Sequence, residues 1–329
     1  MDARLQTRIQ RYGWDLAADG YGTMWQAQLA GVQAALLHAA DLAPGEQVLD
    51  VACGTGQISL PAAAAVGAEG SVLGVDLSER MVDGARKLAQ RQPLRNLEFA
   101  RMDAAALALP DARFDVVLCS LGLMYVPDPA AALREMHRVL RPGGRLVLSV
   151  WGERKRCGWA GLFEIVDAEV ASEVCPLFFG LGGPDALVRV CRDAGFEQIT
   201  GQRRADTLVY ADGDEACQAA FFGGPVALAW SRFSSEVRDR VGARYLAGLA
   251  AWRDGAGYRV PAEFVVVAAQ RAGSTLGGEG RATAPGALEL GQQREVESGA
   301  QLWFHANLRN DGGFPPCTPP HNWYANRTS

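Results

Sequence analysis

The chain has few residues of the kinds that build metal centres, disulfide frameworks or nucleic-acid interfaces. Its seven cysteines are scattered without a C-x-x-C pair, which favours reduced thiols over a disulfide framework. Its four histidines show no metal-ligand spacing, so we expect no metal centre. Nearly all cations are arginines and the formal net charge is −5, which does not suit the basic face that nucleic acids require.

Long hydrophobic runs are absent as well. No stretch of about 18 consecutive apolar residues occurs, and the first residues contain no apolar core of a signal peptide. We therefore expect a cytoplasmic protein without stable membrane insertion. Hydrophobic residues still make up 49% of the 329 residues, which is enough to fill a sizeable core.

Between residues 26 and 151, short apolar runs alternate with longer stretches of helical periodicity. The runs are rich in Val and Leu with little polar alternation, which is typical of strands buried on both faces. Leu133, Met136 and Leu140 follow the spacing of a helix face. This alternation predicts an α/β fold with a doubly wound, mostly parallel sheet. We expect strands at 47–50, 71–76, 97–102, 114–120 and 145–151.

The rhythm changes after residue 151. We expect helical insertions at 152–185 and 213–252, a strand near 198–204 between them and a last strand at 262–270. From residue 273 onward the chain is rich in Gly and Pro without a period, which is typical of a disordered or loosely packed tail. These features divide the chain into a functional domain, 1–272, and a tail, 273–329.

The stretch VLDVACGTGQISL, residues 48–60, places a glycine turn between a buried strand and a helix. A triphosphate site needs a loop ending in Gly-Lys-Ser/Thr, which the chain lacks. The dinucleotide fingerprint G-x-G-x-x-G is incomplete, because Ser59 stands in the third glycine position. Asp76, 20 residues after Gly56 at the end of the next strand, can accept both hydroxyls of an adenosine ribose. That ribose fits either NAD or S-adenosylmethionine.

Two further carboxylates favour S-adenosylmethionine over NAD. Asp50 directly precedes the glycine turn, where it would repel a pyrophosphate but suits a positive amino group and sulfonium. Asp103, at the end of the third strand, can accept a hydrogen bond from the adenine amino group. The chain has no Tyr-x-x-x-Lys pair, and no histidine follows a strand end as a hydride-transfer acid would.

A family resemblance is carried by four stretches in order: VLDVACGTG, VLGVDLSERMV, ARMDAAALALPDARFDVVLCSLGLMYVPD and REMHRVLRPGGRLVLSVWG. Together they resemble class I S-adenosylmethionine-dependent methyltransferases, most closely the group of ubiquinone/menaquinone C-methyltransferases and small-molecule methyltransferases. The resemblance is strong over about 40–151, looser over 152–270 and absent beyond. It implies a seven-stranded Rossmann-like sheet with helical cap insertions, and S-adenosylmethionine as cofactor. An NAD-dependent oxidoreductase and a non-catalytic module that binds an adenosine ligand stay open as alternatives.

The resemblance implies ten cofactor-binding residues at or just after strand ends: Asp50, Ala52, Gly54, Gly56, Asp76, Leu77, Met81, Asp103, Ala104 and Ser120. The four before residue 57 would hold the methionine part, although many members of the family carry glycine where this chain has Ala52. Asp76 would hold the ribose, and Leu77 and Met81 would pack on the adenine. Asp103 and the Ala104 amide would meet the adenine amino group. Ser120 would lie beside the sulfonium and the methyl acceptor.

No residue identifies itself as a general base. The candidates are Tyr12 and Tyr21, in the N-terminal segment that tends to cover the cofactor in the family, and His137. Each of the three also suits a packing role.

Aromatic residues outside the sheet indicate either a core under the insertions or an apolar acceptor pocket. The cap over such a pocket would be built from 1–40, 152–185 and 213–252. The residues concerned are Trp14, Tyr21, Trp25, Trp151, Phe178, Phe179, Phe221, Phe222 and Trp230. The last five are the ones that we expect to line the cavity.

These features predict a small or medium, largely apolar acceptor, methylated on oxygen or carbon by in-line displacement. A polyanion such as RNA would meet like charge on this acidic chain. Arsenite as acceptor would require clustered pocket thiols, whereas the cysteines are scattered. The oligomeric state stays open, with a homodimer as one option.

Overall fold

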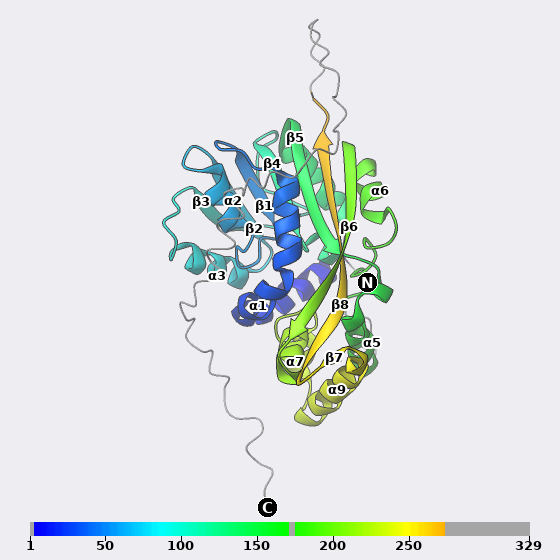
Figure 1. Cartoon of the computed structure of the whole chain (residues 1–329). Coiled ribbons are helices and arrows are strands. Elements are labelled where there is room, and N and C mark those ends of the chain that lie inside the picture. Colours follow the sequence, from blue (N-terminus) through cyan, green and yellow to red (C-terminus); the bar gives the residue numbers. More distant parts are fainter. Residues whose placement is uncertain (1–2, 171–174, 274–329) are drawn as a thin grey trace, which may run out of the picture.

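A mostly parallel sheet runs through the residues that the computed structural model describes, 3–170 and 175–273 (Figure 1). Its main path follows the order β3-β2-β1-β4-β5-β8-β6, and a two-residue strand, β7, pairs with β8. The strands are β1 (Gln47–Val51), β2 (Ser71–Asp76), β3 (Leu97–Arg101), β4 (Phe114–Ser120), β5 (Leu140–Trp151), β6 (Phe196–Tyr210), β7 (Arg253–Asp254) and β8 (Gly257–Arg271). The predicted α/β fold class is confirmed. The predicted tail, 273–329, lies outside the described residues except for its first.

The strand order sets the place of the site. Strands β1 to β5 pair in parallel, whereas β8 runs antiparallel to both β5 and β6. From β1, the chain first builds outward through β2 and β3 and then returns to add β4 on the other side. A crevice for ligands forms outside the carboxyl ends of the strands at such a switch point.

Helices connect and flank the strands. They are α1 (Ala3–Ala40), α2 (Ser59–Val66), α3 (Glu79–Ala89), α4 (Pro129–Val139), α5 (Gly161–Val170), α6 (Ala186–Asp193), α7 (Gly213–Phe221), α8 (Ala227–Arg232) and α9 (Ser235–Gly248). Short 3-10 turns lie at Leu123–Tyr125, Arg154–Arg156, Gly158–Ala160 and Ala250–Trp252. Local sequence explains several helix starts. Ser78 caps α3 by accepting from the Met81 amide, and Asp128 caps α4 by accepting from the Ala131 amide, just before a proline at the first helical position.

Three strands extend several residues beyond the ranges that the sequence predicts. Strand β5 begins at Leu140 rather than 145: Leu140 pairs with Phe114 of β4, pairing resumes at Arg145, and the Arg-Pro-Gly-Gly segment between them is an irregularity in the ladder. Strands β6 and β8 pair with each other over almost their whole length and form a ribbon. Figure 1 shows this ribbon continuing below the main sheet, where it carries α7, β7 and α9. Part of the predicted insertion 213–252 therefore packs on the ribbon rather than on the main sheet.

The N-terminal helix α1 is the largest cap element. It spans 38 residues and changes direction along its length in Figure 1. Gly20 and Gly22 lie near its middle, and glycines permit such bends. The first half of α1 packs against α3 and α8 through a small apolar cluster that contains Ala17, Met81 and Ala227. The second half joins the main core through Leu29, Val32 and Leu36, which are almost fully buried.

Candidate active site

A cavity opens at the carboxyl ends of β1, β2 and β4, where the strand order places the crevice. It encloses about 1030 Å³ of empty space, its open mouth included. Eight of the ten residues that the resemblance assigns to the cofactor line it: Ala52, Gly54, Asp76, Leu77, Met81, Asp103, Ala104 and Ser120. Asp50 and Gly56 do not line the cavity: Asp50 lies behind the turn, and Gly56 lies within the turn and packs onto α2.

The turn after β1 has an unusual backbone. Ala52, Gly54 and Gly56 all have positive φ angles, of 56°, 54° and 86°. Such angles are common for glycine and rare for alanine, which explains why a glycine at position 52 would be the less strained choice. A Cβ on Gly54 would lie 3.7 Å from the Tyr21 ring, at the cavity wall. A Cβ on Gly56 would instead come within 2.9 Å of Leu60, so this glycine permits close packing of the turn onto α2.

Asp76 ties this turn to the end of β2. Its carboxylate accepts the backbone N–H of Gly54 and the backbone N–H of Ser78, each at 2.9 Å. Burial raises the pKa of Asp76 to about 6, although these two hydrogen bonds oppose the shift. Two bonds leave acceptor capacity on the carboxylate for hydroxyl groups of a ligand.

Asp50 supports the turn from behind. Its side chain is 1% exposed, and one oxygen accepts the Ser59 hydroxyl at 2.5 Å. The other oxygen has no hydrogen-bond partner among the described residues. Burial, with a smaller effect of the Asp76 charge, raises the pKa of Asp50 to about 7. An unpaired carboxylate oxygen behind the glycine turn fits a site for a positively charged ligand rather than for a pyrophosphate.

The ends of β3 and β4 complete the polar half of the cavity. Asp103 accepts the Ala105 amide at 2.9 Å, which shapes the loop after β3. The Ser120 hydroxyl lies 3.2 Å from that of Ser149 on β5. These two side chains therefore have local structural partners besides any ligand.

Of the three candidate bases, only Tyr21 lines the cavity. Burial and the nearby charge of Asp76 raise the pKa of its hydroxyl well above the ordinary range, so the phenol stays protonated at neutral pH. Tyr12 is 50% exposed and lies under the Arg11 guanidinium, outside the cavity lining. The structure therefore places Tyr12 away from the cavity in which we expected a base.

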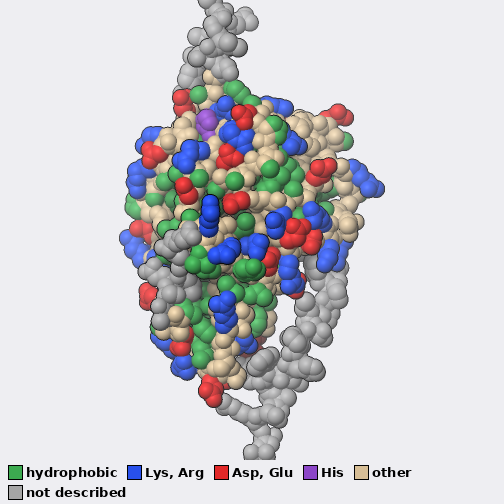
Figure 2. All heavy atoms as spheres, turned by 180° about the vertical axis from the view of Figure 1, so that it is seen from behind, with side chains coloured by type: hydrophobic (Ala, Val, Ile, Leu, Met, Phe, Trp, Pro, Cys, Tyr) green, Lys and Arg blue, Asp and Glu red, His purple; other side chains and the backbone are tan. Residues whose placement is uncertain are grey.

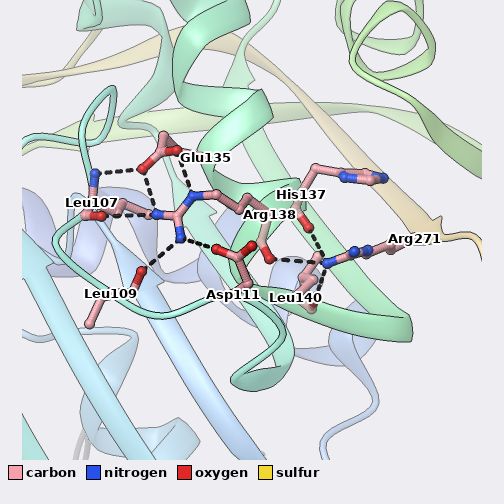
Figure 3. A network of polar contacts seen from close by, with 8 residues as sticks. All are labelled: Leu107, Leu109, Asp111, Glu135, His137, Arg138, Leu140 and Arg271. Carbon is pink, nitrogen blue, oxygen red and sulfur yellow. Dashed lines mark hydrogen bonds and ion pairs between the residues drawn. The ribbon is translucent and has the colours of Figure 1, made fainter.

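His137 is also outside the cavity. Its ring packs edge-on against Phe196, with the centroids 5.0 Å apart, and burial lowers the pKa of the imidazole. Figure 3 shows that its carbonyl, not its ring, joins a polar network: Arg271 donates to the His137 and Arg138 carbonyls at 3.0 Å. The His137 ring therefore packs near the end of α4, away from the cavity in which we expected a base.

The expected aromatic pocket is partly right. Trp14, Tyr21, Trp25, Trp151 and Phe178 line the cavity, together with Trp159 and Tyr125, which sequence reasoning missed. Of the five aromatics expected to line it, only Phe178 does so. Phe221 stacks on Trp230 in the core, with centroids 4.2 Å apart, Phe222 is 49% exposed, and Phe179 packs behind Phe178.

Two further groups of residues reach the cavity from the predicted cap elements, although no motif singled them out. Thr7 and Gln10 come from the first turns of α1, and residues 223–225 come from the loop before α8. Only long-range packing brings them to the strand ends. All three predicted cap elements therefore contribute to the wall.

Two properties of the described residues concern a metal site and a membrane span. No group of three or more His, Cys, Asp or Glu side chains there could hold a metal ion. None of the helices in residues 3–170 and 175–273 is both long and apolar enough to cross a membrane. On the face seen in Figure 2, basic side chains are interspersed with acidic ones, so this face offers no continuous basic track.

Comparisons with known proteins agree on one kind of protein. Residues 48–144 match the family described as methyltransferase domain. A ubiquinone/menaquinone biosynthesis C-methyltransferase of Shewanella oneidensis is 30% identical over 181 residues, which cover 50% of this chain and 72% of the relative. A demethylmenaquinone methyltransferase of Listeria welshimeri is 41% identical over 119 residues, covering 36% of this chain and 50% of the relative. The chain thus spans about half the length of these demethylmenaquinone methyltransferases.

Solved structures support the fold. Phosphoethanolamine N-methyltransferase 2 of Haemonchus contortus, in complex with S-adenosyl-L-methionine, superposes with a TM-score of 0.51 at 16% identity, covering 78% of this chain and 57% of that one. The YcgJ protein of Bacillus subtilis superposes with a TM-score of 0.50 at 16% identity, covering 74% of this chain and 98% of that one. At such identities the likeness concerns the fold alone.

Proposed function

Because this chain belongs to the class I S-adenosylmethionine-dependent methyltransferases, near the ubiquinone/menaquinone C-methyltransferases, we propose that it methylates a small or medium, largely apolar acceptor. The accepting atom is an oxygen or a carbon. The cavity at the switch point of the sheet is the site of this reaction.

The polar half of the cavity suits the cofactor. Asp76 would accept the ribose hydroxyls with the capacity that its two backbone bonds leave free. Leu77 and Met81 offer apolar surface for the adenine. Asp103, which also lines the cavity, would accept a hydrogen bond from the adenine amino group. The positive φ of Gly54 brings backbone rather than side chain to the cavity wall, where the methionine part would lie. When bound, the cofactor supplies an electrophilic methyl group on its sulfonium.

The other half of the cavity suits an apolar acceptor. Its wall is largely aromatic and comes from all three cap elements. Enclosure by α1 and the insertions would exclude water and hold acceptor and cofactor at reacting distance. The Tyr21 phenol, kept protonated by burial, would donate or accept a hydrogen bond rather than remove a proton. We therefore infer that positioning supplies most of the catalysis.

One observation carries the choice of cofactor: two carboxylates, the buried Asp50 and the partly buried Asp76, flank the glycine turn. Two acids there disfavour a pyrophosphate and favour a cationic ligand. Titration calorimetry with S-adenosylmethionine, S-adenosylhomocysteine and NAD tests this directly. We expect micromolar binding of the first two and no heat from NAD. Tight NAD binding without adenosylhomocysteine heat would favour the oxidoreductase alternative.

The acceptor is tested separately. A panel of phenols, quinols and lipids is incubated with S-adenosylmethionine, and release of adenosylhomocysteine is measured. We expect turnover with at least one apolar member of the panel. Cofactor binding without turnover on any small molecule, but with turnover on RNA or protein, would overturn the proposed acceptor class. Cofactor binding with no acceptor of any class would support the non-catalytic module.

A further inference from the structure

A single buried amide stands in the apolar half of the cavity. Gln10, on the first half of α1, is 7% exposed and lines the cavity. Its amide nitrogen makes one long contact, 3.8 Å to the Cys175 sulfur, which is a weak acceptor. Its amide oxygen has no partner among the described residues. Gln10 therefore brings almost its full hydrogen-bonding capacity, both donor and acceptor, to the cavity.

Aromatic rings form much of the wall that Gln10 also lines. The Cys175 thiol, which Gln10 contacts, also lies 3.9 Å from the Pro225 carbonyl, on another cap element. Tyr125 packs edge-on against Trp14 at 4.9 Å and against Phe178 at 5.4 Å. Trp159 continues the series, 5.5 Å from Phe178 and 4.7 Å from Trp151. The wall thus combines aromatic surface with the Gln10 amide, the group among its described polar side chains that both donates and accepts through separate atoms.

The charges of the cavity wall further restrict which acceptors can bind. The described residues that line the cavity include no Lys, Arg or His, and their carboxylates lie in the cofactor half. A carboxylate or phosphate on the acceptor would thus be buried without a cation, at a large cost. A neutral hydroxyl or carbonyl oxygen can instead pair with the Gln10 amide, which both donates and accepts.

Resting on the proposed methyl transfer, we propose that Gln10 is a specificity-determining residue of the acceptor subsite. It selects a planar, uncharged aromatic acceptor that bears a hydroxyl or carbonyl oxygen, and it disfavours aromatic or aliphatic molecules without one. The rings of Tyr125, Phe178 and Trp159 bind the body of this acceptor, and Gln10 pairs with its oxygen. An apolar ligand that filled the subsite would leave the buried amide unpaired, at a cost of about 1–3 kcal/mol.

The test uses the full chain saturated with S-adenosylhomocysteine and two probes, 2-naphthol and naphthalene. Equilibrium dialysis gives the ratio of their affinities for the wild type, Gln10→Leu and Gln33→Leu. Gln33 is a matched control, because it is a buried glutamine of the same helix that bonds Gln57 and does not line the cavity. If Gln10→Leu does not fold, Gln10→Met replaces it.

We expect Gln10→Leu to lower the preference for 2-naphthol over naphthalene by about 10-fold or more, the lower part of the range for an unpaired buried amide. Gln33→Leu should leave the ratio within twofold of the wild type. A ratio unchanged in Gln10→Leu, or lowered equally in Gln33→Leu, would overturn the inference. Failure of both probes to bind a protein that binds adenosylhomocysteine would also overturn it. Failure of adenosylhomocysteine to bind would instead contradict the proposed function.

Discussion

The carboxylate of Asp76 and the backbone N–H of Gly54 are joined by a hydrogen bond of 2.9 Å, so the end of β2 holds the turn that follows β1. The second carboxylate oxygen accepts the amide of Ser78, the residue that caps α3. One side chain thus fixes the glycine turn and the start of a helix, and it also faces the cavity. Asp76 therefore holds the backbone beside the cavity in which we propose that the cofactor binds.

We predict that Asp76→Ala weakens adenosylhomocysteine binding by about 2–4 kcal/mol, because hydrogen bonds to a charged acceptor are lost. The same substitution should lower stability modestly, since two backbone amides lose their acceptor. Calorimetry gives the affinity and thermal unfolding gives the stability. Asp115→Ala, which also removes a carboxylate with a backbone amide partner but lies outside the cavity, is the matched control. An affinity of Asp76→Ala within twofold of the wild type would remove this residue from the site.

Asp50 gives a prediction about pH. Burial raises the pKa of its carboxyl to about 7, above the ordinary value near 3.8, so the folded chain binds more protons than the unfolded chain between these values. Stability therefore falls as the pH rises from about 4 through 7, and the full penalty is present above 7. The raised pKa of Asp76, about 6, acts in the same direction. The lowered pKa of His137 acts in the opposite direction near pH 6, because its charged form is disfavoured in the folded chain.

We predict that Asp50→Asn gains melting temperature relative to the wild type when the pH is raised. The difference in melting temperature between variant and wild type should be a few degrees larger at pH 8 than at pH 5.5. The comparison of the two proteins at each pH cancels the contribution of His137. Thermal unfolding of the ligand-free protein at both pH values measures the difference. Asp111→Asn, which neutralises an exposed carboxylate, is the control substitution. A constant difference between wild type and Asp50→Asn would mean that Asp50 does not titrate in this range.

The network in Figure 3 predicts a loss of stability without a loss of function. Arg138 donates to both oxygens of Glu135 and to the carbonyls of Leu107 and Leu109, at 2.7 to 2.9 Å. Its ion pair with Asp111 is solvent-exposed and adds little. Arg138→Met should lower the free energy of unfolding by about 2 kcal/mol, because Glu135 and two carbonyls lose their donor.

Urea unfolding measures this loss. Arg134→Met is the control, since Arg134 is more exposed and its ion pair with Asp128 spans 3.9 Å. Adenosylhomocysteine affinity should stay within twofold in both variants, because neither residue lines the cavity. A large loss of affinity in Arg138→Met would show that this network also shapes the site.

The cofactor half of the site was predictable because its residues are set by local sequence. Asp76 is the last residue of β2, Asp103 lies two residues beyond the end of β3, and parallel strands bring such ends to one edge of the sheet. The capping signals of Ser78 and Asp128 likewise act within a few residues. Asp50 was placed correctly at its strand, but only the packing shows that it lies behind the turn.

The acceptor half was not predictable in the same way. The pairs Phe178–Phe179 and Phe221–Phe222 stand in similar Phe-Phe-Gly contexts, yet only Phe178 reaches the cavity. Phe221 is held by Trp230, which lies on the adjoining helix α8, whereas Phe222 points to the surface. Gln10 carried no sequence signal, since one glutamine on a helix has no distinguishing spacing. These outcomes depend on how α1 and the insertions pack, which is decided by contacts over more than a hundred residues of chain.

Substitutions at Tyr21 distinguish a positioning role of this residue from general-base catalysis. Its ring covers the glycine turn, 3.7 Å from where a Cβ of Gly54 would be, and packs edge-on against Trp14 at 5.7 Å. Its hydroxyl is kept protonated by burial and by the charge of Asp76. Tyr21→Phe keeps the ring and removes the hydroxyl. We expect kcat, measured as adenosylhomocysteine release with an acceptor from the panel, to stay within about threefold, whereas loss of a general base costs about 100-fold or more.

Tyr21→Ala provides the complementary measurement. Without the ring, the turn loses its cover and Trp14 loses a partner, so we expect adenosylhomocysteine affinity to fall by about 10-fold, equivalent to about 1.4 kcal/mol. Tyr12→Phe and Tyr12→Ala are the matched controls, because Tyr12 is half exposed on the same helix and does not line the cavity. A fall of 100-fold in kcat for Tyr21→Phe, with affinity and melting temperature unchanged, would make the phenol a base despite its burial. A fall in affinity for Tyr21→Ala alone would assign Tyr21 to holding the cofactor against the turn.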